Sequence, residues 1–596
     1  MSPRLRPLWK LLAAPGLALS FAHASEPLLP TQSLLLPPHE LGVGRRVEDL
    51  SLETSAGIQV PLHTLAQGKA LLIALFQPTC PLSHKLGPEL ARMEKQCAAQ
   101  GILPLLLNVS PHPNPESERT FLQKYGLQSA VVRDARQAFL PALRASTSTE
   151  TFLLDRTLTL VYRGAIHDQY GLDHTKPEPE HHFLREALRA LSEGKRPAIE
   201  ATSAPGCALS LPHATPPPPS QLTYHKDIQR ILQNHCVPCH REQGLGPFSL
   251  ESLPDVLEHA AMIRKQVERG AMPPWFAAKA PRHVWANDTS LGEQDKADLL
   301  AWLASDRPQG DPAHAPLPPR FAKEWTLGEP DAVLEMPAPV HVKAEGTMPY
   351  QYALLETHFP EDRWVQAYEI LPSAPAVVHH VIVSVQEPGA KTPRLNAVEG
   401  FWAAYVPGNS ARRFPEGCAK RLPAASKLAL QIHYTPNGTA MQDRIRIALH
   451  FSKSPPRQEV KVTSLANLRL QIPPGAPDHV ETAQRVLPRS LEITGYMAHM
   501  HVRGKAFKYE VIPPGGKPET LLEIPRYHFL WQLQYSYLQP RLIPAGSTLK
   551  ATATFDNSSA NPANPNPAQT VRWGEQTHDE MMIGYIEHLV PATLTP

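Results

Sequence analysis

The sequence predicts a chain of several domains: an α/β domain, then a mostly helical domain, then two all-β sandwich domains. Three observations predict this order. Buried-strand runs alternate with helical periodicity up to about residue 207, and a CxxCH motif follows within a helical stretch. From about residue 325, short strands alternate with Gly and Pro turns, which is typical of sandwiches. A length of 596 residues allows about three or four domains.

Proline-rich stretches and changes of pattern mark the expected boundaries. The chain has 66 prolines, about twice the usual share, which favours turns and spacers over long helices. The expected segments are a signal peptide (1–24), the α/β domain (40–207), a linker (208–221), the helical domain (222–310), a second linker (311–324), and two β-domains (325–460 and 461–592).

The N-terminus is typical of a secretory signal. Three basic residues precede an apolar run over 11–21, and Ala22-His23-Ala24 forms a small-x-small cleavage site. The run is too short to span a bilayer, and no later stretch approaches 18 apolar residues. The sequence therefore predicts an exported protein without a membrane span. Its net charge of +2 gives no electrostatic footprint for nucleic acid.

The α/β pattern rests on alternating runs in the first 200 residues. We expect strands at 70–76 and 102–108, helices at 82–99 and 116–125, and a closing hairpin over 151–155 and 158–162.

Cys80 lies where the first of these strands meets its helix. A helix N-terminus stabilises a thiolate and lowers the pKa of the thiol. The segment from Phe76 to His84 resembles the thioredoxin and peroxiredoxin superfamily, which implies that fold and a redox thiol at Cys80. Ser83 replaces the second cysteine of a CxxC, and Thr149 or Glu150 stands where a cis-proline is usual.

Two outcomes stay open for Cys80. A dithiol cycle would need Cys97 or Cys207 as its resolving partner. Otherwise the domain is a scaffold with an inert or weakly reactive thiol. The six cysteines provide no disulfide framework for a chain of this size.

The motif Cys236-Val-Pro-Cys239-His240 is the attachment motif of c-type haem. Its two thiols form thioethers to the vinyl groups, and the adjacent imidazole of His240 ligates the iron. Helical patterns over 224–234 and 293–304, the latter with Trp302 on its apolar face, suit a cytochrome c fold. A haem site and a signal peptide together indicate a bacterial periplasm or the cell exterior.

The sixth iron ligand is expected to be Met272. Its loop resembles the Met-Pro-Pro-Trp loop of small class I cytochromes c, and His/Met ligation implies electron transfer rather than O2 binding. The alternatives are Met262, His235, His259 and His283.

A second kind of metal site is indicated by histidines in the β-domains. In a strand, His499 and His501 project to one side, which makes half a metal site. The segment around Met581 and Met582 offers a thioether, and a soft sulfur beside two imidazoles suits Cu(I). Upstream, three imidazoles without sulfur would hold copper or zinc; they belong to His379, His380 and His433.

The order HH, HY, HxH, DEM over residues 325–590 resembles the copper type II ascorbate-dependent monooxygenases. The resemblance implies one copper on His379, His380 and His433. It implies a second copper, where O2 is activated, on His499, His501 and Met581. It favours Met581 over Met582, because the family's methionine follows an Asp-Glu pair.

The resemblance has further consequences for the strands and the substrate. Adjacent His379 and His380 can serve one metal only if their strand ends or bulges there. Met497 and Ile583 replace an arginine and an asparagine that anchor a peptide carboxylate, which argues against a peptide ending in glycine. The segments 555–558 and 561–567 are interpreted as turns that help to fix Met581.

The leading hypothesis is a copper-dependent monooxygenase that hydroxylates a C–H bond with O2 and receives electrons through the fused haem. Ascorbate, another external reductant or an electron-donor protein would supply the electrons. The substrate, a small molecule or a peptide, is not identified by the sequence. The first alternative is a copper-binding electron carrier without oxygenase activity, and the second is a thiol-disulfide oxidoreductase.

Overall fold

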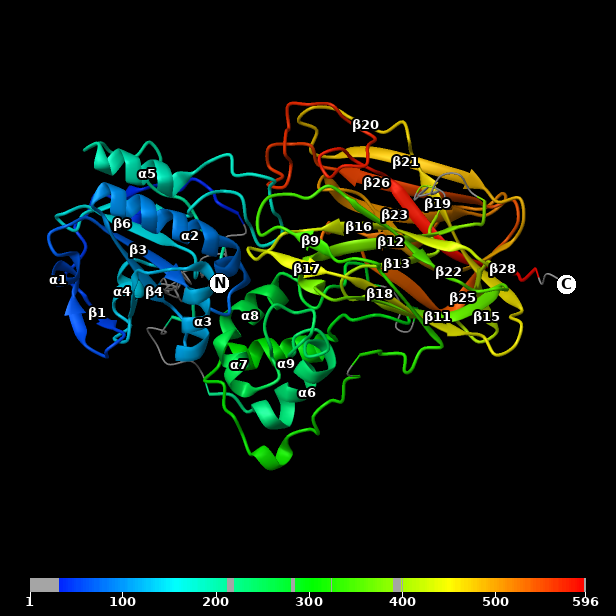
Figure 1. The fold of residues 1–596 in the computed structure, drawn as a ribbon, viewed down its shortest axis with the longest axis horizontal. Coiled ribbons are helices and arrows are strands. Elements are labelled where there is room, and N and C mark those ends of the chain that lie inside the picture. The colour runs from blue at the N-terminus through cyan, green and yellow to red at the C-terminus, as the bar shows by residue number, and fades with distance from the viewer. Residues whose placement is uncertain are drawn as a thin grey trace, which may run out of the picture.

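The computed structural model describes residues 32–593 except 212–218, 280–283, 323, 390–397 and 399. The expected signal peptide and the alternative iron ligand His283 lie outside the described residues. Within the described part, no helix has both the length and the apolar content needed to cross a bilayer. From N- to C-terminus the chain forms an α/β region, a group of short helices and a β-rich region (Figure 1).

The α/β region contains a seven-stranded sheet with the order β2-β1-β5-β4-β3-β6-β7. Within it β3 and β4 are parallel, while β6 and β7 run antiparallel to their neighbours, which is a thioredoxin-like arrangement. The predicted α/β fold is confirmed, but β1, β2, β5 and α5 were not expected. The strands are β1 (Ser51–Thr54), β2 (Gln59–Pro61), β3 (Leu71–Phe76), β4 (Leu103–Asn108), β5 (Ala130–Arg133), β6 (Thr151–Leu154) and β7 (Leu160–Gly164).

Helices cover both faces of this sheet, so the central strand β3 is buried at every position. Alternate residues of β3 contribute to two different apolar clusters. One cluster includes α2, α3 and α5, and the other includes α1 and α4. The helices are η1 (His39–Leu41), α1 (Leu62–Ala66), α2 (Pro81–Gln100), α3 (Pro115–Tyr125), α4 (Phe139–Ala142) and α5 (Phe183–Ser192).

The helical region surrounds a small apolar core. Trp302 is fully buried there, and its ring lies 6.0 Å from that of Tyr224. The expected helices at 224–234 and 293–304 are both present, the first beginning as a π-helical turn. The elements are η2 (Tyr224–Ile228), α6 (Gln229–His235), α7 (Leu253–Glu258), α8 (Ala260–Glu268) and α9 (Glu293–Leu303), followed by η3 (Pro312–His314) in the linker.

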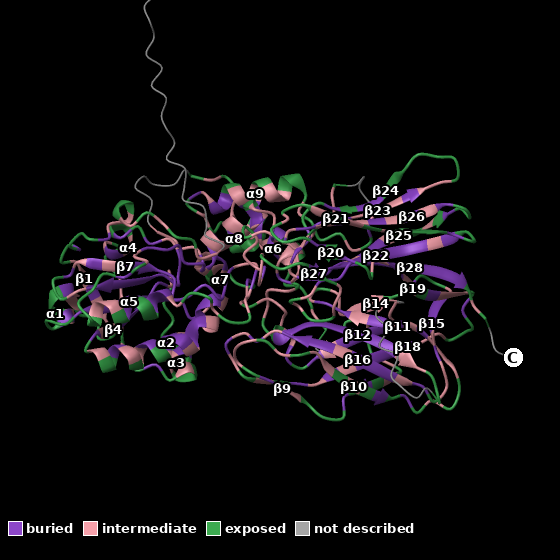
Figure 2. Cartoon of the chain, turned by 90° about the horizontal axis from the view of Figure 1, so that it is seen from above, coloured by how far each residue is buried: buried purple, intermediate pink, exposed green. Residues whose placement is uncertain are grey.

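The β-rich region forms two sandwiches that share one sheet. A nine-stranded sheet has the order β25-β22-β28-β19-β15-β11-β18-β8, with β14 pairing β11. A four-stranded sheet, β10-β16-β12-β13, packs on one half, and another, β21-β26-β23-β24, packs on the other (Figure 2). The expected boundary at residue 460 falls within β19, which pairs in parallel with β15 and so joins the sandwiches.

The strands up to that boundary are β8 (Ala332–Glu335), β9 (Val340–Val342), β10 (Gln351–Glu356), β11 (Arg363–Pro372), β12 (Val378–Gln386), β13 (Ala403–Tyr405), β14 (Ala411–Arg413), β15 (Cys418–Leu422), β16 (Lys427–Tyr434), β17 (Met441–Asp443) and β18 (Ile445–Phe451). A 3-10 turn, η4 (Pro375–Val377), precedes β12.

The remaining strands are β19 (Gln458–Ala466), β20 (Gln471–Ile472), β21 (His479–Val486), β22 (Leu491–His499), β23 (Gly504–Ile512), β24 (Glu519–Ile524), β25 (Gln534–Ile543), β26 (Thr548–Phe555), β27 (Val571–Arg572) and β28 (Ile583–Pro591).

All three regions meet at Asp173. Its carboxylate pairs with Arg269 of the helical region and with His528, which follows β24. Nearby, Nη1 of Arg526 donates to the carbonyl of Arg269 over 2.8 Å. Burial opposes ionisation of Asp173, but its hydrogen bond to His528 and the charge of Arg269 outweigh burial and lower its pKa to about 2.

We expect Asp173→Asn to weaken this junction at neutral pH. Because the pKa is lower in the folded protein, the stabilisation is complete above the unfolded pKa of about 4 and is lost as the pH falls toward 2. The thermal midpoint of the wild type should therefore exceed that of Asp173→Asn by a constant margin from pH 7 to 5. The margin should shrink from about pH 4 downward; a margin independent of pH would contradict the role of this charge.

Candidate functional site

The first three histidines meet on the four-stranded sheet of the first sandwich. His380 of β12 is the direct cross-strand partner of His433 of β16. The register shifts between Val378 and His380, so the strand bulges at His379, as two adjacent ligands require. A nitrogen from each of the three rings lies within 4.8 Å of the others.

The second set comes from the centre of the second sandwich. His499 ends β22 and pairs with Ile583 of β28. Continued by two residues, the same antiparallel register sets Met581 opposite His501. Met582 is buried in the core of the second sandwich, whereas Met581 belongs to a small separate cluster with Met497 and Ile583. The strand geometry therefore distinguishes the two methionines and favours Met581.

The two sets of histidines face each other across the sandwiches. The ring centroids of His380 and His499 are 6.0 Å apart, and those of His499 and His501 are 5.3 Å apart. Phe529, from the loop between β24 and β25, stacks on His379 at 4.6 Å and lies 6.4 Å from His501. Five imidazoles from both sandwiches thus form one cluster, which we call the five-histidine cluster.

Several ring nitrogens of the cluster have protein partners. Nε2 of His379 lies 3.1 Å from the carbonyl oxygen of Phe529, and Nδ1 of His499 lies 2.7 Å from Oε1 of Gln532. Nδ1 of His501 lies 3.3 Å from the carbonyl oxygen of Asp579. These contacts orient the rings, as the outer partners of metal ligands do.

Two other ring nitrogens of the cluster are buried and have no hydrogen bond to any residue that the structure describes. They are Nδ1 of His433 and Nε2 of His501. Buried polar atoms of this kind are rare in folded proteins, because each costs about 1–3 kcal/mol. One unpartnered nitrogen in each half of the cluster fits a metal ion in each half.

The cluster is electrically neutral at pH 7. Burial, together with the neighbouring histidines, lowers the pKa of His379 to about 4 and that of His501 to about 3. The pKa values of His380 and His433 fall for the same two reasons, and burial also lowers that of His499. Neutral imidazole is the form that binds a metal, so the cluster needs no deprotonation before loading.

Glu580 ties the HxH segment to the methionine segment. This fully buried carboxylate accepts the backbone N–H groups of His501, Arg503 and Met581. Burial raises its pKa to about 7, although these three hydrogen bonds oppose the shift. At the level of sequence, Glu580 only marks the position of the expected ligand Met581.

Arg503 holds the asparagine-rich loop, residues 555–567, against the segment that carries Met581. Its Nε donates to Oδ1 of Asn557 and of Asn564, each over 3.0 Å, and its Nη1 donates to the carbonyl of His578 over 2.9 Å. The structure therefore connects the 555–567 loop to the segment that carries Met581. Arg503, Glu580 and Gln532 were missed because no local pattern marks residues whose partners lie 30 to 80 positions away.

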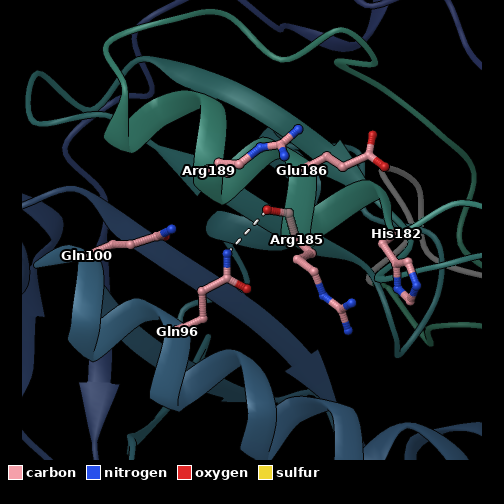
Figure 3. Close-up of a pocket in the computed structure, with 6 residues that line it drawn as sticks. All are labelled: Gln96, Gln100, His182, Arg185, Glu186 and Arg189. Carbon is pink, nitrogen blue, oxygen red and sulfur yellow. Dashed lines mark hydrogen bonds between the residues drawn. The ribbon is translucent and has the colours of Figure 1, made fainter.

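A hollow lies over strands β12, β15 and β19, and its lining combines Phe401, Trp402 and Val462 with four charged side chains, those of Lys420, Arg421, Glu459 and Lys461. Phe401 and Val462 also pack against the cluster that contains Met581. A second hollow lies between α2 and α5, and six polar residues line it (Figure 3). Gln96 donates there to the carbonyl of Arg185 over 3.2 Å.

The CxxCH segment follows α6 in a turn of the helical region. Nδ1 of His240 lies 3.1 Å from the carbonyl oxygen of Phe248, which leaves Nε2 for an iron. Phe248 in turn stacks on His259 at 3.8 Å, and within the described part of the chain Nδ1 of the buried His259 has no hydrogen-bond partner. His259 is therefore a second candidate for the sixth iron ligand, in addition to Met272.

The Met272 loop docks on the second sandwich. Phe276 stacks on His528 at 5.5 Å, and Trp275 packs edge-on against Tyr535 at 4.9 Å. The backbone N–H of Ala278 donates to the carbonyl of Glu523 over 2.8 Å. The helical region is thus in contact with the loop that carries Phe529.

Cys80 lies in a fully buried position at the N-cap of α2. Ser83 accepts the N–H of Gln77 over 3.2 Å and holds the preceding turn. Of the two expected partners, Cys207 lies against Cys80, whereas Cys97 is in the last turn of the same helix.

No protein-family model matches this chain, and no curated protein matches it. Solved structures match its N-terminal part. A hypothetical protein from Sinorhizobium meliloti 1021 is 25% identical over 31% of this chain and all of its own, with a TM-score of 0.27. An uncharacterized conserved protein from Geobacillus kaustophilus is 23% identical over 31% of this chain and 97% of its own, also with a TM-score of 0.27.

A third match is a putative thiol:disulfide interchange protein DsbE from Chlorobium tepidum. It is 17% identical over 21% of this chain and 84% of its own, with a TM-score of 0.19. The thioredoxin-like assignment of the α/β region itself rests on the strand order described above.

Arg503→Met should loosen the segment that carries Met581. The substitution removes the donor to Oδ1 of Asn564 and one of the two donors to Oδ1 of Asn557, at a cost on the order of 3 kcal/mol in the free energy of unfolding. Urea unfolding measures this loss. The matched control is Arg572→Met, because Arg572 is exposed and bonded only to Gln471 among the described contacts. Equal losses in both variants would contradict a structural role of the buried network.

Proposed function

We propose that this chain is an exported copper-dependent monooxygenase that hydroxylates a C–H bond with O2. The observation that carries the proposal is the convergence of five buried, neutral imidazoles from two sandwiches, with one unpartnered nitrogen in each half. Copper held there would activate O2 and store an electron. His379, His380 and His433 would hold one ion, and His499, His501 and Met581 the other.

The donor sets support copper over hard cations. Imidazole nitrogen and thioether sulfur are soft or intermediate ligands, whereas Mg and Ca prefer oxygen. The one other group of metal-capable side chains found among the described residues is Asp168, Glu180 and His181. Its Asp168 already pairs with Lys176 over 2.7 Å, which leaves less charge for an ion.

The side chains around Met581 support an apolar substrate. Phe401, Val462 and Trp573 pack against the cluster that contains Met581. Met497 and Ile583 belong to the same cluster and offer no group that would bind a carboxylate. The proposed substrate class is therefore a C–H bond in an apolar group.

We further propose that a c-type haem on Cys236, Cys239 and His240 passes electrons to the cluster. The support is a pair of ring stacks at adjacent positions of one loop: Phe276 of the Met272 loop stacks on His528, and Phe529 stacks on His379. His528 and Phe529 are neighbours in the chain. An external reductant, ascorbate or an electron-donor protein, would reduce the haem.

Burial of the cluster favours the alternative function, a copper-binding electron carrier without oxygenase activity. All five histidines are less than 10% exposed. Oxygen uptake by the ascorbate-reduced protein distinguishes the two. A carrier consumes only as much O2 as its stored electrons can reduce. A monooxygenase sustains O2 uptake when an apolar substrate is added.

Copper content tests the ligand assignment directly. The wild type should bind two copper ions, while His379→Ala/His380→Ala and His499→Ala/His501→Ala should each lose one. His450→Ala and His588→Ala are matched controls, because both histidines are buried in the same sandwiches and outside the cluster. One ion or none in the wild type, with no loss on substitution, would show that these histidines are structural.

Phe529→Leu tests the electron path. Removing the ring that stacks on His379 should slow reoxidation of the reduced haem by the copper-loaded protein several-fold, measured by stopped-flow absorbance. Phe359→Leu is the control, since Phe359 is similarly half-buried and packs against Phe451 in the first sandwich. Unchanged reoxidation in Phe529→Leu would remove this loop from the path.

A further inference from the structure

Cys80 and Cys207 come together although 126 positions separate them in the chain. The two thiols are close enough for each to shift the pKa of the other. Ser148 bridges them: its hydroxyl donates to Sγ of Cys80 over 3.2 Å and accepts the backbone N–H of Cys207 over 3.1 Å. Both cysteines are buried in the same apolar cluster.

Cys207 belongs to a segment that we call the strap, residues 200–209, which follows α5. The strap runs antiparallel to residues 146–149: the N–H of Ser148 donates to the carbonyl of Cys207 over 2.9 Å, and the N–H of Leu209 donates to that of Ser146 over 3.1 Å. A Cβ on Gly206 would lie 2.9 Å from Thr147, so only glycine allows this close approach.

Cys97 cannot replace Cys207 as the partner. Cys80 caps the N-terminus of α2, which is 20 residues and therefore about 30 Å long, and Cys97 lies in its last turn. A disulfide requires Cα atoms within about 7 Å.

We propose that Cys80 and Cys207 are a redox-active pair, which closes to an intramolecular disulfide by exchange with a small disulfide of the glutathione class. This site goes beyond the proposed copper function and does not depend on it.

The two thiols are suited to different steps. Burial opposes ionisation of Cys80, but hydrogen bonds from Cys207, Ser148 and the N–H of Ser83 outweigh burial and lower its pKa to about 6. The hydrogen bond to Cys80, together with burial, raises the pKa of Cys207 well above its usual range. Cys80 is therefore the attacking thiolate at neutral pH, and Cys207 keeps its proton.

The exchange balances in two steps. The Cys80 thiolate attacks one sulfur of the small disulfide, breaks its S–S bond and releases one thiolate. Cys207 then gives its proton to solvent or to that thiolate and attacks Sγ of Cys80, which releases the second thiolate. The pair loses two electrons, and the small disulfide gains them as two thiols.

Glu258 of α7 covers the turn that precedes Cys80. Its Oε1 accepts from Nε2 of Gln77 over 2.8 Å and from Oγ1 of Thr79 over 3.4 Å, and its Oε2 accepts from the N–H of His112 over 3.1 Å. Because both thiols are buried, a small disulfide reaches them only when these contacts open. Access to the pair thus depends on the contact between the α/β and helical regions.

The test uses the full chain, equilibrated with oxidised and reduced glutathione, then alkylated and mapped by mass spectrometry without reduction. In the wild type we expect a cross-linked Cys80–Cys207 peptide that disappears as reduced glutathione increases. Cys207→Ser should instead accumulate glutathione on Cys80, and Cys97→Ser should behave like the wild type. Glu258→Ala should form the cross-link several-fold faster, and Ser148→Ala should shift the pH profile of the reaction upward.

Two results would overturn the proposal. One is complete alkylation of Cys80 and Cys207 at every glutathione ratio, including in Glu258→Ala, where access is improved. The other is a glutathione adduct on Cys80 that is as abundant in the wild type as in Cys207→Ser, because Cys207 would then not resolve it.

Discussion

The ion pair between Arg412 and Glu587 holds the two sandwiches at a fixed spacing. Arg412 lies on β14 of the first sandwich and Glu587 on β28 of the second. Both side chains are largely buried, and Oγ1 of Thr494 also donates to Glu587 over 2.8 Å. Removing one partner of such a pair typically costs about 3–5 kcal/mol, because the other charge is left buried and unpaired. The distance between the two halves of the five-histidine cluster depends on this contact and on the β15–β19 pairing.

Part of the arrangement of the histidines could be predicted from strand periodicity. It predicts that His499 and His501 lie on one side, and their ring centroids are 5.3 Å apart, although β22 itself ends at His499. The bulge at His379 was implied by the family resemblance and not by periodicity, and it is present. The resemblance favours Met581 over Met582, and the two side chains differ in the structure, because Met582 is buried in the core of the second sandwich and Met581 belongs to a separate cluster. These surroundings depend on the pairing of β22 with β28, segments about 90 positions apart, which no local pattern encodes.

Other features could not be predicted because they arise from contacts between regions. The β-rich part was expected to divide near residue 460, whereas the sheet continues through this position in β19. Gln532 and the carbonyl of Phe529 reach the cluster from a loop without any metal-binding pattern. Likewise the sequence alone does not distinguish Cys97 from Cys207 as the partner of Cys80. In the structure, α2 places Cys97 far from Cys80, whereas the strap places Cys207 next to it.

The position of β28 has a consequence for biosynthesis. In the nine-stranded sheet it lies between β22 and β19, yet it is the last strand of the described chain. The second sandwich therefore lacks a central strand until β28 has been synthesised, about 90 residues after β22. At roughly 5–20 residues per second this delay lasts several seconds, during which β19 and β22 have unpaired edges. A chaperone that shields exposed strands would act during this interval, before the metal ligands of the two sandwiches can meet.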